Sequence, residues 1–209
     1  MTLLIETIKQ LREETHAGVQ DCRKALEASN QNYAAALEII RKQAAEEAAR
    51  RANHMASQGM IELYSHAGGR IGVMVEVNTE SDYAGRSDIF RDFTHEIALQ
   101  IAASAPLYVR DEDIPSIALD EQRQKAAETI DLRSKPEVVR VKILEGYVEK
   151  YKNTSVLLRQ PYIRDDALTI AQLLEQMIAK IGENIVIRRF QRWELNDSMM
   201  HTDDDLANA

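Results

Sequence analysis

The chain has 209 residues, enough for one sizeable hydrophobic core or for a small module beside a core. Charged residues make up 29% of the sequence and aromatic residues only 5%, a balance that favours helices over an all-β sandwich. The formal net charge of -8 argues against a generic nucleic-acid-binding protein, and the single cysteine, Cys22, excludes an intramolecular disulfide and a cysteine-based zinc site.

Nothing in the sequence predicts export or membrane insertion. The N-terminal stretch includes Glu6 and has no long apolar run, unlike a signal peptide. No segment approaches the roughly 18 apolar residues of a membrane-spanning helix. We therefore expect a cytoplasmic protein that makes no membrane contact.

The first fifty residues are predicted to form a separate helical module. Apolar residues recur at helical spacing in three short segments within 1–50, and polar or glycine-containing breaks separate these segments. A bundle of this size is marginally stable by itself. Residues 42–57 mix alanine with charged residues and have no apolar stripe, so we expect a solvated helical linker there.

The remaining core, residues 51–195, is predicted to begin with two strands over 58–63 and 70–78, joined by a hairpin turn. A polar loop with one aromatic residue, Tyr83, follows the second strand. A lone aromatic residue beside an acidic one, Asp82, on a loop fixed at both ends is well suited to contact another molecule. The alternative from the residues alone is that Tyr83 folds back onto the sheet and Asp82 caps the next helix.

Helices are predicted to dominate the chain after this loop. Ser87 is expected to cap the first of them, in which Phe90, Phe93, Ile97 and Ile101 form one apolar face. Residues 111–154 are helical and charged, and they form either a helical arm packed along one edge or a surface for a partner. A capping box at Thr169 begins a further helix that Gly182 ends, and a strand follows. Residues 196–209 are acidic and are expected to be a disordered tail. The fold class is therefore α+β.

The sequence contains no pattern typical of catalysis or metal binding. Its five histidines form no metal-spaced pair, and the helical spacing of Cys22 indicates a core position. The glycine-rich run at 68–72 lacks the Gly-Lys-Ser/Thr of a phosphate-binding loop and leads into a strand. We expect no active site, no metal and no cofactor.

Three collinear stretches, spread over residues 3–195, resemble the bacterial elongation factor Ts family. They are LREETHAGVQDCRKAL at 11–26, GRIGVMVEVNTESDYAGR at 69–86, and a C-terminal segment containing KIGENI at 180–185. The resemblance implies a ubiquitin-associated-like three-helix bundle, a linker, and an α+β core with a small antiparallel sheet and packed helices. Longer members have a duplicated core half, so this chain resembles the compact form.

The resemblance also implies a function. Such a protein is a guanine-nucleotide exchange factor, not an enzyme, that binds the GDP form of elongation factor Tu and disturbs its Mg²⁺ and phosphate site. The family usually has Thr, Phe, Val and Ala where Ser81, Tyr83, Ala84 and Gly85 stand, and Gly at the position of His16. The implied contact residues are Ser81, Asp82, Tyr83, Ala84, Gly85 and Arg86 in the signature loop, Arg12, Thr15, His16, Ala17, Gly18 and Asp21 in the N-terminal module, and, more weakly, Gln100 on a core helix.

Other interpretations remain open at this point. Gln100 could be a solvent-side helix residue. The helical bundle could bind a different protein without exchange activity, or Arg188, Arg189 and Arg192 could contact RNA or the ribosome, although these arginines are more simply explained as solvated charges beside a strand. Because the chain contains one core unit, self-association into a homodimer is a further expectation, and no nucleic-acid partner is expected.

Overall fold

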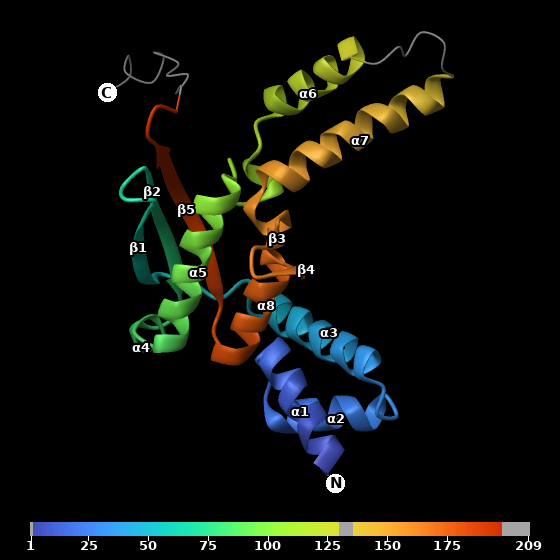
Figure 1. Cartoon of the computed structure of the whole chain (residues 1–209), viewed down its shortest axis with the longest axis vertical. Helices are drawn as coiled ribbons and strands as arrows, with labels where there is room; N and C mark the ends of the chain where they lie inside the picture. Colours follow the sequence, from blue (N-terminus) through green and yellow to red (C-terminus); the bar gives the residue numbers. More distant parts are fainter. Residues whose placement is uncertain (1, 130–135, 198–209) are drawn as a thin grey trace.

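The computed structural model describes residues 2–129 and 136–197, with side chains for residues 4–128 and 136–197. Three N-terminal helices lie beside a core in which helices pack on a small antiparallel sheet, and a helical arm projects from the opposite end (Figure 1). The expected α+β class is confirmed. Within the described residues, no helix is long and apolar enough to cross a bilayer, and no cluster of His, Cys, Asp or Glu is arranged to bind a metal ion.

The N-terminal module consists of α1 (Thr2–Thr15), α2 (Val19–Ala28) and α3 (Tyr33–Arg51). Asn32 begins α3 by accepting a hydrogen bond from the backbone N–H of Ala35 at 3.0 Å, a common N-cap arrangement. A small separate core holds the three helices together. Its buried members are Leu11, Cys22, Ala25, Leu26, Ala36 and Ile40.

The prediction of a solvated linker over residues 42–57 is wrong for its first part. Residues 42–51 continue α3, Ala44 is buried, and Ala48 packs against the main core. This half of α3 contacts α8 (Ile170–Ile181). Alanine side chains let two helices approach closely, so α3 buries this face without the large apolar stripe that sequence patterns usually reveal.

The main sheet has the strand order β1-β2-β5, and both pairings are antiparallel. The strands are β1 (Gln58–His66), β2 (Ile71–Thr79) and β5 (Ile185–Glu194). The predicted hairpin is confirmed, with a longer first strand and a second strand shifted by one residue. Alternate residues of β2 are buried against the helices, as their period of two predicts.

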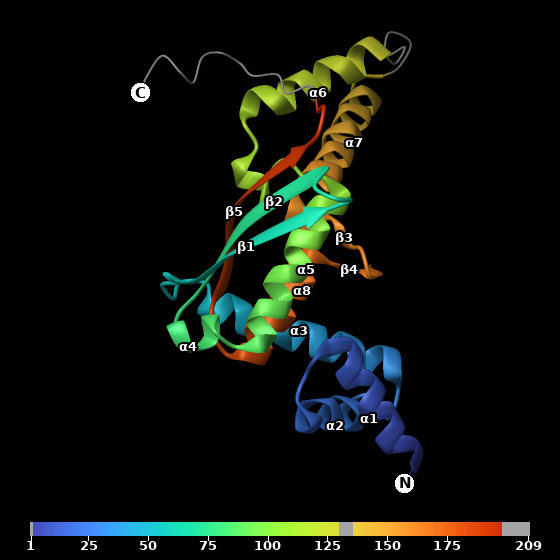
Figure 2. The same cartoon turned by 60° about the vertical axis from the view of Figure 1, so that its left-hand side comes forward.

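One face of this sheet is covered by α5 (Asp88–Ser104), while α8 completes the core (Figure 2). Ser87 caps α5 by accepting a hydrogen bond from the Phe90 N–H at 3.3 Å, as predicted. The capping box at Thr169 and the left-handed Gly182 at the end of α8, with φ of +78°, are also confirmed. The predicted apolar face of α5 is buried, and it comprises Phe90, Phe93, Ile97 and Ile101.

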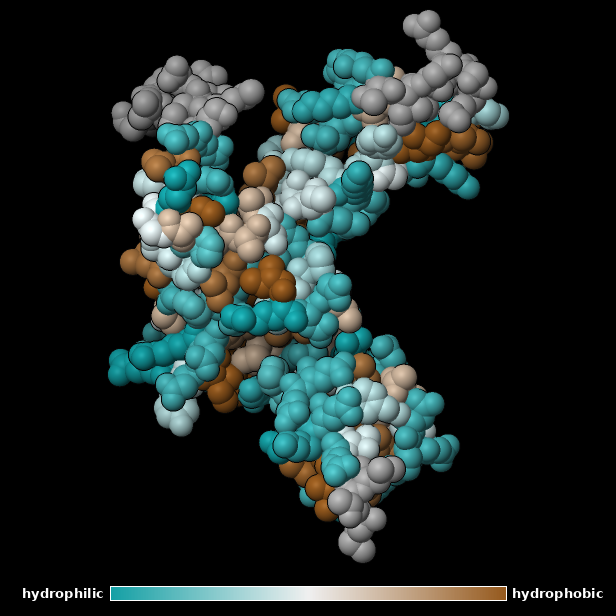
Figure 3. Space-filling model, viewed as in Figure 1, coloured by the Kyte–Doolittle hydropathy of each residue, from teal (hydrophilic) through white to brown (hydrophobic). Residues whose placement is uncertain are grey.

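The arm consists of α6 (Ser116–Thr129) and α7 (Glu137–Ser155), which pack on each other and project from the core (Figure 1). Hydrophobic residues lie exposed toward the outer end of α7 (Figure 3), where the helix carries Val138, Val139 and Val141, and Tyr147 is exposed further along it. The expectation of an arm packed along one edge is therefore wrong, since contact with the core is concentrated at the base.

Short elements connect the arm to the core. They are the 3-10 turns η1 (Asp111–Asp113) and η2 (Leu157–Arg159) and the two-stranded ribbon of β3 (Pro161–Tyr162) and β4 (Asp165–Thr169). Arg159 Nε donates to Asp111 Oδ1 at 2.6 Å and so ties η2 to η1. The sheet ends in a turn at residues 195–196, and residues 198–209 of the predicted acidic tail lie outside the described residues.

Candidate partner-binding site

The predicted signature loop forms a single helical turn, α4 (Asp82–Gly85), directly after β2. Ser81 Oγ accepts a hydrogen bond from the Ala84 N–H at 3.2 Å and caps this turn, so the alternative in which Asp82 is the cap is wrong. Asp82 instead forms an exposed ion pair with Arg86 at 2.9 Å. The carboxylate therefore stays on the outer side of the turn.

Tyr83 extends into solvent from α4. Its side chain is 88% exposed, so it does not fold back onto the sheet. The next two residues, Ala84 and Gly85, are buried. A Cβ atom at position 85 would lie 3.2 Å from the Cα of Gly59 on β1, so glycine permits this close approach. Small residues on the inner side thus fix the turn against the sheet, while the aromatic ring points outward.

The α8–β5 turn holds the signature loop from behind. The Glu183 carboxylate accepts hydrogen bonds from Thr79 Oγ1 at 3.0 Å, the Ser81 N–H at 2.9 Å and Ser81 Oγ at 2.6 Å. In return, Glu80 Oε1 accepts a hydrogen bond from the Asn184 N–H at 2.6 Å. Each of the two segments, far apart in the sequence, therefore supplies a carboxylate that accepts a hydrogen bond from a backbone N–H of the other segment.

The pKa values of both carboxyl groups reflect these contacts. Burial alone would raise the pKa of Glu183, but the hydrogen bonds from Ser81 and Thr79 outweigh burial and hold the pKa below its ordinary value. The hydrogen bond from the Asn184 backbone lowers the pKa of Glu80. Sequence reasoning missed Glu80 and Glu183 as site residues, although the KIGENI motif that contains Glu183 was a signal for the second.

The N-terminal module presents most of its predicted contact residues. Arg12, His16, Gly18 and Asp21 are exposed and Ala17 is half-buried. Thr15 is buried, and its Oγ1 donates to the Leu11 carbonyl at 2.6 Å, so its side chain supports the predicted contact turn from the inside. Its hydroxyl is occupied by this hydrogen bond at the C-terminal end of α1.

His16 has a φ of +56°, in the left-handed region that glycine adopts most easily. This conformation explains why glycine is usual at the corresponding position of the family resembled by the sequence. His16 also borders a groove of about 720 Å³ between the N-terminal module and the end of α8. Burial and then the charge of Lys180 lower the pKa of its imidazole, which favours the neutral ring.

Gln100 is fully buried beneath the arm, so the alternative in which it is a solvent-side helix residue is wrong. Its amide nitrogen donates to Gln160 Oε1 and to the Pro161 carbonyl, each at 3.2 Å. Its amide oxygen accepts a hydrogen bond from the Ile163 N–H at 2.9 Å. The side chain joins α5 to the β3–β4 ribbon and has no surface for a partner.

The arginines considered for RNA binding are engaged with the protein's own acidic and carbonyl groups. Arg189 and Arg188 lie 2.7 Å and 3.8 Å from Glu76 carboxylate oxygens, and Arg192 lies 2.7 Å from Glu194. Each pair reduces the local positive charge that a phosphate backbone would require.

In both views, α4 and the N-terminal module lie toward the same end of the molecule (Figures 1 and 2).

A protruding aromatic turn and a second exposed helical surface at one end of the molecule suit a factor that acts by contact with another macromolecule. The sequence model described as "Elongation factor TS" matches residues 1–178. The chain belongs to the elongation factor Ts family, and its role lies in translation elongation.

The curated relatives match almost the whole chain. Elongation factor Ts of Carboxydothermus hydrogenoformans is 43% identical over 202 residues, which cover 97% of this chain and 93% of the relative. That of Picosynechococcus sp. is 43% identical over 201 residues, with 96% and 92% covered. The chloroplastic elongation factor Ts of Rhodomonas salina is 40% identical over 203 residues, with 97% and 93% covered.

Proposed function

We propose that this protein is a guanine-nucleotide exchange factor that binds the GDP form of elongation factor Tu and promotes GDP release. The observation that carries the proposal is the 88% exposed ring of Tyr83, held beside Asp82 on a turn whose inner side is buried. Family membership supplies the partner and the kind of reaction. The protein itself performs no covalent chemistry in this proposal.

The Tyr83 ring would act as a wedge at the nucleotide site of the partner. An aromatic side chain inserted between packed elements displaces the residues that support a bound Mg²⁺ ion. Because Mg²⁺ requires nearly ideal octahedral geometry, a small displacement weakens its binding. The GDP phosphates are then less well neutralised, and GDP dissociates faster. Asp82, adjacent to the ring, would add negative charge close to the same phosphates.

A wedge alone does not supply enough interaction energy. Each tenfold decrease in GDP affinity requires about 1.4 kcal/mol of coupling between the two binding events. We propose that the N-terminal module provides the second contact, through Arg12, His16, Asp21 and the turn at Ala17–Gly18. Because α3 packs on α8, this surface and the Tyr83 turn belong to one connected structure.

Reciprocal binding measurements test this proposal. The affinity of elongation factor Tu for GDP is measured with and without saturating protein, and the affinity for the protein is measured with and without GDP. Linkage requires the same factor of decrease in both experiments. An unchanged GDP affinity with demonstrable complex formation would instead favour an interaction module without exchange activity.

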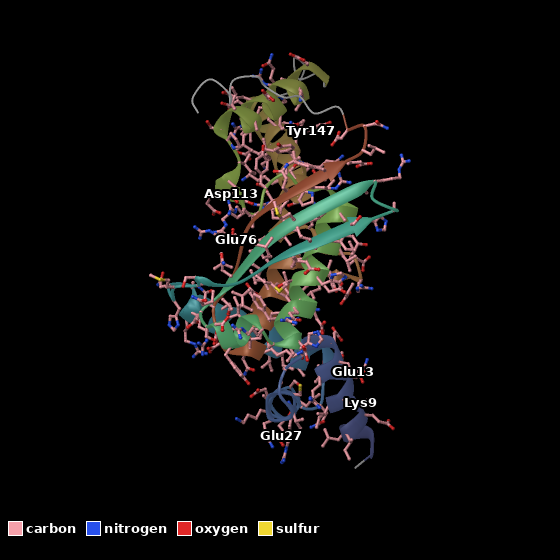
Figure 4. All side chains as sticks on the ribbon, turned by 90° about the vertical axis from the view of Figure 1, so that its left-hand side faces the viewer. Lys9, Glu13, Glu27, Glu76, Asp113 and Tyr147 are labelled. Carbon is pink, nitrogen blue, oxygen red and sulfur yellow. The ribbon has the colours of Figure 1, made fainter. Side chains whose placement is uncertain are left out.

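We also propose that two copies of the chain associate through the sheet face that α5 leaves uncovered. Figure 4 looks onto this face, with Glu76 labelled on β2. Leu63 is 72% exposed and Trp193 67% exposed there, and they flank a shallow groove with Met74. Such exposure of large apolar residues on one face is typical of an interface. Sedimentation equilibrium of the wild type and of Leu63→Asp tests this: a dimer that becomes a monomer is expected, whereas a monomeric wild type contradicts it.

A further inference from the structure

The α4 turn is too short to hold its own shape. It has four residues, and a helix of this length is unstable in isolation because its nucleation is costly. The ion pair between Asp82 and Arg86 is exposed on both sides and contributes little. An exposed ring on such a turn would sample many directions unless the base of the turn were fixed by other parts of the protein.

Glu183 supplies that fixation from 102 to 104 residues away in the sequence. One oxygen, Oε2, accepts hydrogen bonds from the Ser81 N–H and from Thr79 Oγ1, and the other, Oε1, accepts one from Ser81 Oγ. Hydrogen bonds to an ionised carboxylate are roughly twice as strong as those between neutral groups. Ser81 Oγ also accepts from the Ala84 N–H, so a bonded path leads from Glu183 into the turn that carries Tyr83.

The position of Glu183 is itself well determined. It follows Gly182, whose left-handed backbone ends α8, and it precedes Asn184, which is buried. The Asn184 side chain donates to the His54 carbonyl at 2.8 Å, and its backbone N–H donates to Glu80. The α8–β5 turn is therefore hydrogen-bonded to the end of β2, to the residues that begin α4 and to the segment that precedes β1.

We infer that Glu183 is a positioning residue for nucleotide exchange, which holds the α4 turn so that Tyr83 enters the partner in one orientation. This inference rests on the proposed exchange function. Glu183 acts through Ser81 and does not itself contact the nucleotide. Glu183→Gln keeps the size of the side chain but replaces one acceptor oxygen with an amide N–H₂ donor and removes the negative charge. At least one of the three present donations to this side chain can then no longer be made, and the others become weaker.

The first test uses hydrogen exchange in the free protein, without elongation factor Tu. In Glu183→Gln, the Ala84, Gly85 and Arg86 amides should exchange about tenfold faster than in the wild type, while the amides of β2 stay protected. Glu175→Gln is the matched control, since Glu175 is a half-buried carboxylate on α8 that is not among the partners of the turn. It should leave all three amides unchanged. Unchanged protection in Glu183→Gln would overturn the inference, as would loss of protection throughout the sheet.

The second test measures release of fluorescent GDP from elongation factor Tu. Glu183→Gln should lower kcat/KM about tenfold, equivalent to about 1.4 kcal/mol. In a Tyr83→Ala background, the same change should have little further effect, because no ring remains to be positioned. Two fully multiplicative effects would overturn the inference, since Glu183 would then act independently of the ring.

The two tests separate this inference from the proposed function. If the wild type does not accelerate GDP release, the proposed function fails, whatever the amide exchange shows, and the role of Glu183 in exchange fails with it. If the wild type is active and the Glu183→Gln amides remain protected, only the positioning role fails. A purely structural role would lower the melting temperature without producing the dependence on Tyr83.

Discussion

Replacing Tyr83 with alanine should separate stability from function. Tyr83 is 88% exposed, so only about an eighth of its surface is covered by the rest of the chain. A tyrosine buries roughly 200 Å² when fully enclosed, and the covered part is therefore about 25 Å². At about 25 cal/mol per Å², its removal costs about 0.6 kcal/mol of unfolding free energy, or about 2 °C in melting temperature.

The effect of Tyr83→Ala on exchange should be much larger. Exposed aromatic residues that enter a partner often contribute about 2 kcal/mol or more to the complex. Loss of that amount from the exchange transition state would slow GDP release roughly 30-fold at limiting protein. Tyr83→Phe should keep most of the rate, because the ring and not the hydroxyl displaces the partner's elements.

The assay is a thermal melt and a stopped-flow GDP-release measurement on the same samples. Phe90→Ala serves as the contrasting variant, because Phe90 is fully buried and its truncation should cost about 3–5 kcal/mol. A Tyr83→Ala protein that melts many degrees lower but releases GDP at the normal rate per folded molecule would refute the wedge.

Three further predictions concern truncation of the N-terminal module, the dependence of stability on acid pH through Glu183, and the left-handed backbone of His16. A chain that begins at residue 33 keeps α3 and should retain a cooperative melt near that of the wild type, whereas one that begins at residue 52 exposes the α8 face and should melt at a clearly lower temperature in calorimetry. Hydrogen bonds keep the folded-state pKa of Glu183 below its ordinary value of 4.5, so its stabilising effect is present above about pH 4.5 and is lost as the pH falls through the folded value. The melting temperature of the wild type should therefore decrease as the pH falls below about 4.5, and that of Glu183→Gln should decrease less steeply over the same pH range. His16→Gly should not lower the melting temperature, because relief of the left-handed strain offsets the added freedom of the unfolded chain, whereas His16→Val should lower it by several degrees.

Local patterns in the sequence were sufficient to predict much of the fold. The strand alternation before Tyr83, the capping residues Ser87 and Thr169, and the helix-ending Gly182 all depend on neighbours within a few residues, and the structure has each of them. These features are encoded locally because caps and period-two strands are satisfied by nearby backbone groups.

Features that depend on tertiary packing were not predictable in this way. The burial of Ala44 against another element leaves no apolar stripe in the sequence, and buried Gln100 is hydrogen-bonded to a ribbon that lies 61 to 63 residues further along the chain. Glu183 and Ser81 meet only because β2 and β5 are neighbours in the sheet. The candidate site was therefore predictable as a loop, but the contacts that hold that loop were not.

Release of fluorescent GDP from purified elongation factor Tu, with this protein at one-tenth of its partner's concentration, tests the central claim most directly. The account predicts that every partner molecule releases its GDP much faster than it does spontaneously, with each molecule of this protein acting several times. Spontaneous release rates in the presence of a folded protein at micromolar concentration would contradict it.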